Sequence, residues 1–109
     1  MQWSDLTLAH VLEAAKRIAA HVQRTPIVST APLTQETGAA EVFLKLESLQ
    51  NTGAFKVRGA ANRILSLSEE EKRRGVITFS TGNHGKAVAY VAGRCGIPAV
   101  VCVSEHVAR

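Results

Sequence analysis

Residues 52–60 of the chain read TGAFKVRGA, and they are the strongest single indication of its chemistry. A lone lysine, Lys56, follows the turn-forming pair Thr52-Gly53 and stands at the opening of a helix predicted over residues 55–65. The unpaired N–H groups and the dipole of a helix N-terminus disfavour an ammonium ion, and partial desolvation there favours the neutral amine. Because a neutral lysine attacks carbonyl carbons and forms Schiff bases, Lys56 is a candidate covalent catalyst. The alternative is an exposed helix lysine without a chemical role.

Residues 80–85, STGNHG, form the second informative stretch. They lie between a strand predicted over residues 76–80 and a helix predicted over residues 83–95. A strand, a glycine-containing turn and a helix N-terminus together make an anion site from backbone N–H groups and small polar side chains. The candidate site residues are Ser80, Thr81, Asn83 and His84. The alternatives are that Asn83 is an ordinary helix cap and that His84 is a polar residue at a helix start.

Apolar periodicity and helix-ending residues outline the rest of the chain. The N-terminal part is predicted to contain a helix from Thr7 to Val22, a short strand at residues 27–28, a helical turn at residues 34–37 and a strand over residues 41–47. The C-terminal part is predicted to contain a short helix that a capping box at residues 68–71 opens and Gly75 closes, and a buried strand over residues 99–103.

The order strand, helix, strand over residues 76–103 is typical of a β-α-β crossover, which is parallel and right-handed. We therefore expect an α/β fold with a parallel sheet and flanking helices. Parallel sheets need helices on both faces, and the chain supplies few strands and few helices. The fold is accordingly expected to be incomplete.

The composition is that of one small globular domain, with 109 residues, 46% of them hydrophobic and 20% charged, and a net charge of +4. The densest basic group, residues 72–74, lies at a predicted helix C-terminus, where cations complement the dipole, so no nucleic-acid surface is predicted. No apolar run reaches the length of a membrane span and no signal peptide is evident, so a cytoplasmic location is expected. Cys95 and Cys102 have neither metal-ligand nor redox spacing, so no metal site is predicted.

Residues 47–60, followed by residues 80–85, resemble the fold-type II pyridoxal-phosphate enzymes. The most similar branch is that of the threonine/serine dehydratases and serine racemases. Residues 86–90 and 101–104 add a weaker resemblance to the dehydratases of hydroxyectoine utilisation. The resemblance extends over nearly the whole chain, from about residue 7 to about residue 104.

The resemblance implies a tryptophan synthase beta-like fold. Residues 1–48 would then be a segment of the large domain, and residues 49–109 would be the start of the small domain. The implied activity is that of a lyase that eliminates water and then ammonia from a hydroxy amino acid such as threonine or serine. The full-length family is expected to form homodimers that bind a small amino-acid substrate.

The resemblance also implies a role for each motif residue. Lys56 carries pyridoxal 5'-phosphate covalently and moves the Cα proton of the substrate, while Asn83 hydrogen-bonds the hydroxyl of the cofactor ring. Phe55 packs beside the cofactor, and a place in the core is the alternative for this side chain. The residues that receive the substrate carboxylate are Ser80, Thr81, Asn83 and His84. Arg58 is expected to be a structural or surface charge rather than a catalyst.

The chain departs from the family pattern at several places. Ala54 stands where the family often has serine, which removes a hydroxyl near the cofactor phosphate. Thr81 stands where dehydratases carry alanine and racemases carry an acid/base serine, and it disfavours racemase activity. The Gly-rich phosphate loop and the residue facing the pyridine nitrogen lie further downstream in the family and do not occur in the 109 residues. The chain alone is therefore expected to be inactive.

Two other interpretations of the sequence are open. The chain could belong to a cysteine-synthase-like enzyme of the same fold type, although residues 58–60 and 82–84 argue against that group. It could also be a non-catalytic interaction module or a truncated gene product. In that case an open sheet edge and an apolar face would seek a partner.

Overall fold

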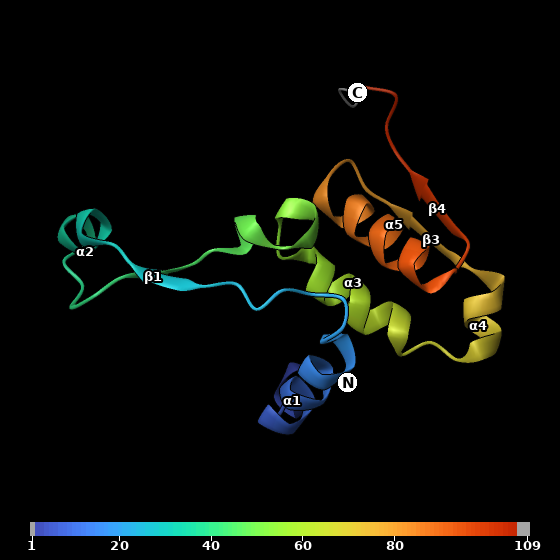
Figure 1. Cartoon of the computed structure of the whole chain (residues 1–109), viewed down its shortest axis with the longest axis horizontal. Coiled ribbons are helices and arrows are strands. Elements are labelled where there is room, and N and C mark those ends of the chain that lie inside the picture. The colour runs from blue at the N-terminus through green and yellow to red at the C-terminus, as the bar shows by residue number, and fades with distance from the viewer. Residues whose placement is uncertain (1, 107–109) are drawn as a thin grey trace.

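The structure, a computed structural model, describes residues 2–106 and combines helices with short strands (Figure 1). In the N-terminal half the elements are the 3-10 turn η1 (Trp3–Asp5), helix α1 (Leu8–Ile18), strand β1 (Ile27–Ser29), helix α2 (Ala31–Thr37) and strand β2 (Phe43–Lys45). In the C-terminal half they are the 3-10 turns η2 (Glu47–Leu49) and η3 (Asn51–Gly53), helices α3 (Lys56–Leu65) and α4 (Glu69–Arg74), strand β3 (Val76–Phe79), helix α5 (Asn83–Cys95) and strand β4 (Ala99–Cys102). The predicted α/β class is confirmed.

Local sequence signals account for the ends of several helices. The predicted capping box is confirmed at α4, where the Ser68 hydroxyl accepts from the Glu71 N–H at 3.2 Å and the Glu71 carboxylate accepts from the Ser68 N–H at 2.8 Å. α5 ends at Gly96, whose φ of +65° is a left-handed conformation that glycine adopts readily. α1 ends at Ile18, earlier than predicted, because the chain turns there and the His21 N–H donates to the Ile18 carbonyl at 2.8 Å.

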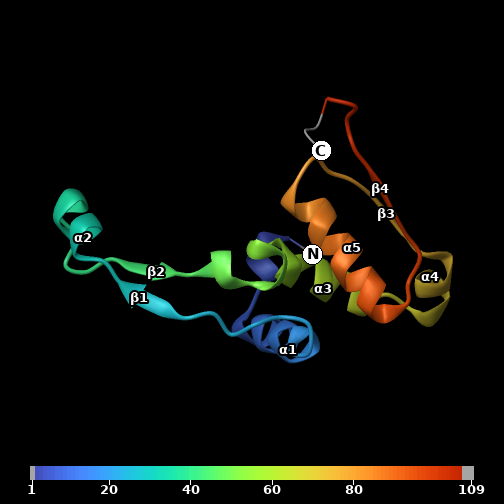
Figure 2. The same cartoon turned by 45° about the horizontal axis from the view of Figure 1, so that its top comes forward.

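The strands form two separate pairs. β3 and β4 are parallel and are joined by α5, which confirms the predicted parallel crossover. In this register Ile77 lies opposite Val100, and Phe79 lies opposite Cys102. β1 and β2, joined by α2, form an antiparallel pair that the sequence pattern did not predict. The β1-α2-β2 segment extends away from the other elements as an arm (Figures 1 and 2).

The core lies between α3 and α5, and α1 packs against α3. The buried residues of this core are all apolar, and several of them are alanines that let α3 and α5 approach closely. They are Ile18, Val57, Ala60, Ala61, Ile64, Ala87, Val88, Val91, Ala92 and Ile97. Val57 follows Lys56 directly in α3 and has no exposed surface. The packing that forms the core therefore also anchors the start of this helix.

β4 is largely exposed, whereas the sequence predicted a buried strand. This prediction is wrong because, among the described residues, α5 covers one face of the β3–β4 pair and nothing covers the other. Ile77, Phe79 and Val100 lie on the uncovered face and remain 73%, 71% and 57% exposed.

The radius of gyration of 16.8 Å exceeds the roughly 13 Å of a compact chain of similar length. No helix within residues 2–106 is both long and apolar enough to cross a bilayer.

Candidate functional site

Lys56 is the first residue of α3, and Phe55 precedes it as the N-cap. The Lys56 Nζ lies 5.2 Å from the centre of the Phe55 ring, which is a cation–π distance. Both side chains are exposed, Phe55 to 60%. Lys56 is therefore not desolvated in the described part of the chain, because no other element covers this side of the first turn of α3. For the same reason Phe55 does not lie in the core.

Ser80 organises the loop that leads into α5. Its Oγ accepts hydrogen bonds from the N–H groups of Gly82 at 3.2 Å and Gly85 at 2.9 Å. A hydroxyl has two acceptor sites and one proton, so the Ser80 O–H is left as a donor. The first-turn N–H groups of Asn83 and His84 have no acceptor within the helix. These donors, together with the dipole of α5, are suited to a carboxylate.

An open hollow of about 310 Å³ brings the two sequence motifs together. It is lined by Phe55, Lys56, Arg58, Gly59 and Ala60 from the first motif and by His84 from the second. Ser80 and Thr81 line another hollow, of about 430 Å³, on the side of α5 that faces β4, and Asn83 lines neither of these two. The structure thus unites Lys56 with His84 and leaves the Ser80-Thr81 pair on the neighbouring side of the α5 N-terminus.

An ion pair holds the segment that leads into α3. Arg58 Nε donates to one carboxylate oxygen of Glu47, and Arg58 Nη2 lies 3.1 Å from the other. The Thr25 hydroxyl donates to this second oxygen at 2.6 Å. The prediction that Arg58 is a structural charge is confirmed by these contacts. The part played by Glu47 was not predicted, although Glu47 opens the stretch of sequence that carries the family resemblance.

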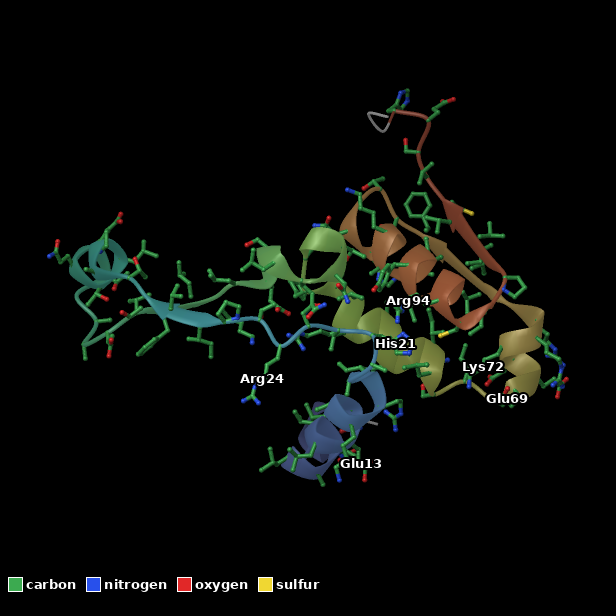
Figure 3. All side chains as sticks on the ribbon, viewed as in Figure 1. Glu13, His21, Arg24, Glu69, Lys72 and Arg94 are labelled. Carbon is green, nitrogen blue, oxygen red and sulfur yellow. The ribbon has the colours of Figure 1, made fainter. Side chains whose placement is uncertain are left out.

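Gln50 is a further residue that sequence reasoning missed. Its side chain is buried, donating to the Gln23 carbonyl at 2.8 Å and accepting from the Gln23 N–H at 2.7 Å. The neighbouring Asn51 Nδ2 donates to the carbonyl of His21 at 2.8 Å, and Figure 3 shows His21 beside α3. The only sequence signal for these contacts is the polar run at residues 50–52. Such a run is equally typical of a solvated turn.

The ion pair makes stability depend on pH. The hydrogen bond from Arg58 lowers the pKa of Glu47 from its ordinary 4.5 to about 2, against the opposing effect of partial burial. In the unfolded chain Glu47 regains its ordinary pKa, so the unfolded state takes up the proton first as the pH falls. We expect the free energy of unfolding to drop by about 1 kcal/mol as the pH falls through this interval, with allowance for solvent screening. Urea unfolding at several pH values, followed by circular dichroism, measures this drop.

The matched protein for this measurement is the Glu47→Gln variant. It lacks the titrating carboxyl, so its stability is expected to fall less over the same pH interval than that of the wild type. An equal fall of the free energy of unfolding with pH in the two proteins would show that Glu47 does not cause the pH dependence.

The residues around the smaller hollow suit pyridoxal phosphate chemically. The exposed primary amine of Lys56 is accessible to an aldehyde, and the Phe55 ring offers an apolar neighbour to an aromatic cofactor. The imidazole of His84 adds a polar group to the lining. The volume falls within the roughly 300–1,000 Å³ that is usual for small-molecule sites. Within residues 2–106, no cluster of His, Cys, Asp and Glu side chains could hold a metal ion.

Comparison with known proteins identifies the class. Residues 18–109 match the family described as "Pyridoxal-phosphate dependent enzyme". Because the match covers most of the chain, the chain belongs to this family of pyridoxal-phosphate-dependent enzymes. The cofactor predicted from the motifs is thereby confirmed as the cofactor of the family.

The relatives place the chain in one branch of this family. It is 44% identical to L-threonine ammonia-lyase of Thermotoga maritima over 101 residues, which are 93% of this chain and 25% of the relative. Its structure resembles serine racemase from Dictyostelium discoideum, with a TM-score of 0.86 and 41% identity, over 94% of this chain and 33% of that one. It also resembles the threonine deaminase from T.th., with a TM-score of 0.74 and 37% identity, over 87% of this chain and 33% of that one. The predicted dehydratase and racemase branch is confirmed, and the chain spans about a third or less of these relatives.

Proposed function

We propose that the chain is part of a pyridoxal-phosphate-dependent lyase that eliminates water and then ammonia from a hydroxy amino acid such as threonine or serine. The observation that carries this proposal is the shared hollow, in which Lys56 of one motif faces the same space as His84 of the other. Chemistry at the α-carbon of an amino acid requires an amine or base close to donors for the carboxylate. The relatives named threonine ammonia-lyase and threonine deaminase support this reaction class.

Lys56, Phe55 and Asn83 are the residues proposed to act at the cofactor and the α-carbon. Lys56 holds the cofactor through Nζ and, when its amine is free, takes the proton from the substrate Cα. Bound pyridoxal phosphate supplies an electron sink for the charge that develops at this carbon. Phe55 gives the cofactor ring an apolar neighbour, and Asn83 hydrogen-bonds its hydroxyl. The contact between Lys56 Nζ and the Phe55 ring supports the roles of these two residues, because it places the ring beside the amine.

The loop and first turn of α5 are proposed to receive the substrate carboxylate, through Ser80, Thr81, Asn83 and His84. The unused O–H of Ser80 supports this role, since its Oγ already accepts two backbone hydrogen bonds and is held in place by them. The first-turn N–H groups add donors that point along the helix dipole. A carboxylate held there would orient the substrate Cα toward the lysine amine, and orientation supplies a large part of catalytic acceleration.

The organisation of the whole protein is proposed on the same basis. Residues 1–48 form a segment of the large domain, residues 49–109 start the small domain, and the enzyme is a cytoplasmic homodimer without a nucleic-acid partner. These assignments rest on the family resemblance carried by residues 47–60 and 80–85. The open hollow and the exposed Lys56 also support the proposal that these 109 residues alone turn over no substrate, because water has free access to the amine.

Reduction with borohydride tests the proposal on the chain as it exists. Pyridoxal phosphate is added, the visible absorption spectrum is recorded, and the reduced protein is digested and its peptides are weighed. We expect an absorption band that free cofactor lacks and a trapped adduct on the peptide that contains Lys56. Absence of the band, with equal labelling of all lysines, would contradict the proposal. Concentration-dependent self-association in that case would favour a non-catalytic interaction module.

A further inference from the structure

The loop that leads into α3 contains a strained residue. Thr52, in η3, has a φ of +69°, a left-handed conformation that β-branched residues seldom adopt. Its Oγ1 is buried and has no hydrogen-bond partner among the described residues. Such strain persists only where the surrounding structure over-determines it, and it is concentrated at functional sites. The contacts that hold this loop in place therefore bear on function.

Glu47 and Arg58 join the two ends of the strained loop. Their ion pair spans 11 positions of sequence and encloses both Thr52 and Lys56. The pair is bidentate, because Nε and Nη2 of Arg58 meet both carboxylate oxygens of Glu47. A planar, bidentate pair restricts direction as well as distance. Since Lys56 precedes Arg58 in the same helical turn, a movement of Arg58 would displace Lys56.

The same pair ties the loop to the segment that precedes β1. Arg58 Nη2 donates to the Gln23 carbonyl at 3.2 Å, and the buried Thr25 hydroxyl donates to Glu47 at 2.6 Å. Gln50, only 4% exposed, adds two hydrogen bonds to the backbone of Gln23. The loop is thus anchored to a neighbouring segment of the chain. None of these anchoring groups except Arg58 lines the hollow that contains the amine.

We propose that Glu47, acting through Arg58, is a positioning residue for Lys56. This inference rests on the proposed function, in which Lys56 carries the cofactor. Glu47 keeps the Lys56 amine in the hollow that it shares with His84, without touching cofactor or substrate itself. Loss of the ion pair lets Thr52 relax toward an unstrained conformation and carries the start of α3 with it.

Two loop variants and one control test this role. Glu47→Gln removes the charge with little change of shape, and Arg58→Lys keeps the charge but lacks the planar fork. The control is Glu69→Gln, the same chemical change at an exposed carboxylate that pairs with Lys72 on α4. Figure 3 shows this pair at α4, well away from the labelled His21. The milder Arg58→Lys change keeps the test decisive if Glu47→Gln unfolds the chain.

The first measurement is amide hydrogen exchange. In both loop variants we expect exchange at residues 51–56 to rise about tenfold, while exchange in the core of α5 and in the Glu69→Gln control stays at the wild-type rate. The second measurement is the ratio of borohydride-trapped cofactor on Lys56 to that on the other lysines. We expect this ratio to fall about tenfold in the loop variants, because a displaced amine loses its oriented site.

Wild-type exchange and wild-type labelling ratios in both loop variants would overturn the proposal. An equal rise of exchange throughout α3 and α5 would overturn it as well, since the pair would then serve only global stability. A wild-type chain that labels Lys56 no more than its other lysines would instead contradict the proposed function. The exchange at residues 51–56 would in that case decide by itself whether Glu47 positions the loop.

Discussion

Lys56→Ala is expected to abolish the borohydride-stable attachment of pyridoxal phosphate at the hollow. Of the side chains that line it, Lys56 alone carries a primary amine, and alanine offers no nucleophile. The loss should therefore be complete rather than partial. The substitution should change the free energy of unfolding by no more than about 0.5 kcal/mol, because Lys56 is exposed and alanine favours helices. A missing adduct is then a chemical effect and not a consequence of unfolding.

Two further variants separate charge from nucleophilicity in this prediction. Lys56→Arg keeps the positive charge at the start of α3 without a reactive amine, and it should lose the adduct as alanine does. Lys86→Ala removes an exposed lysine of α5 and should keep both the absorption band and the adduct. Absorption spectra and peptide masses are the measurements for all three. An adduct that persists in Lys56→Ala would move the attachment site to another lysine.

Gly85→Ala is expected to lower the free energy of unfolding by about 2 kcal/mol. A Cβ at this position would lie 2.8 Å from Val101 Cγ1 and 3.2 Å from Ser80 Cβ. Neither neighbour moves easily, since valine is stiff at χ1 and Ser80 is held by its backbone hydrogen bonds. The gain of about 1 kcal/mol from the better helix propensity of alanine does not offset this overlap. The strain would act directly on the loop proposed to receive the carboxylate.

Gly93→Ala is the matched control on the same helix. A Cβ at Gly93 meets no heavy atom within 4 Å, so only the propensity term acts there. We expect it to raise the free energy of unfolding by up to about 1 kcal/mol. Urea unfolding followed by far-ultraviolet circular dichroism compares both variants with the wild type. We expect the free energy of unfolding to fall in Gly85→Ala and to rise in Gly93→Ala. A change in the same direction in both variants would show that the close approach at Gly85 does not limit stability.

Much of the second half of the chain was predictable from local sequence. The capping box of α4 and the span of α5, residues 83–95, were both predicted and are both found. The parallel pairing of β3 with β4 followed from the spacing of strand, helix and strand. These features depend on residues that lie close together in sequence. Caps, glycine stops and short crossovers act within a few turns of the backbone.

Most of what the sequence did not predict concerns which segments meet in the folded chain. The antiparallel pairing of β1 with β2 is one example. The early end of α1 is the exception, because a local turn closed by the His21–Ile18 hydrogen bond ends that helix. The exposure of β4 and of Lys56 depends on which elements cover them, and the periodicity of a strand or helix does not contain that information. An apolar run of the same composition is buried when both faces are covered and exposed when one face is open.

Residue types along the chain were enough to select Lys56 and residues 80–85 as candidate chemical groups and to indicate the enzyme family. Reactivity belongs to the side chain, and each motif is contiguous, so no folding is needed to recognise either. Only the folded chain decided that Lys56 shares a hollow with His84, and that Glu47 reaches Arg58 across a strained loop. These contacts arise where α3 packs on α5 and where the loop meets the segment before β1. They join positions far apart in sequence, and the packing of the whole chain determines which of them form.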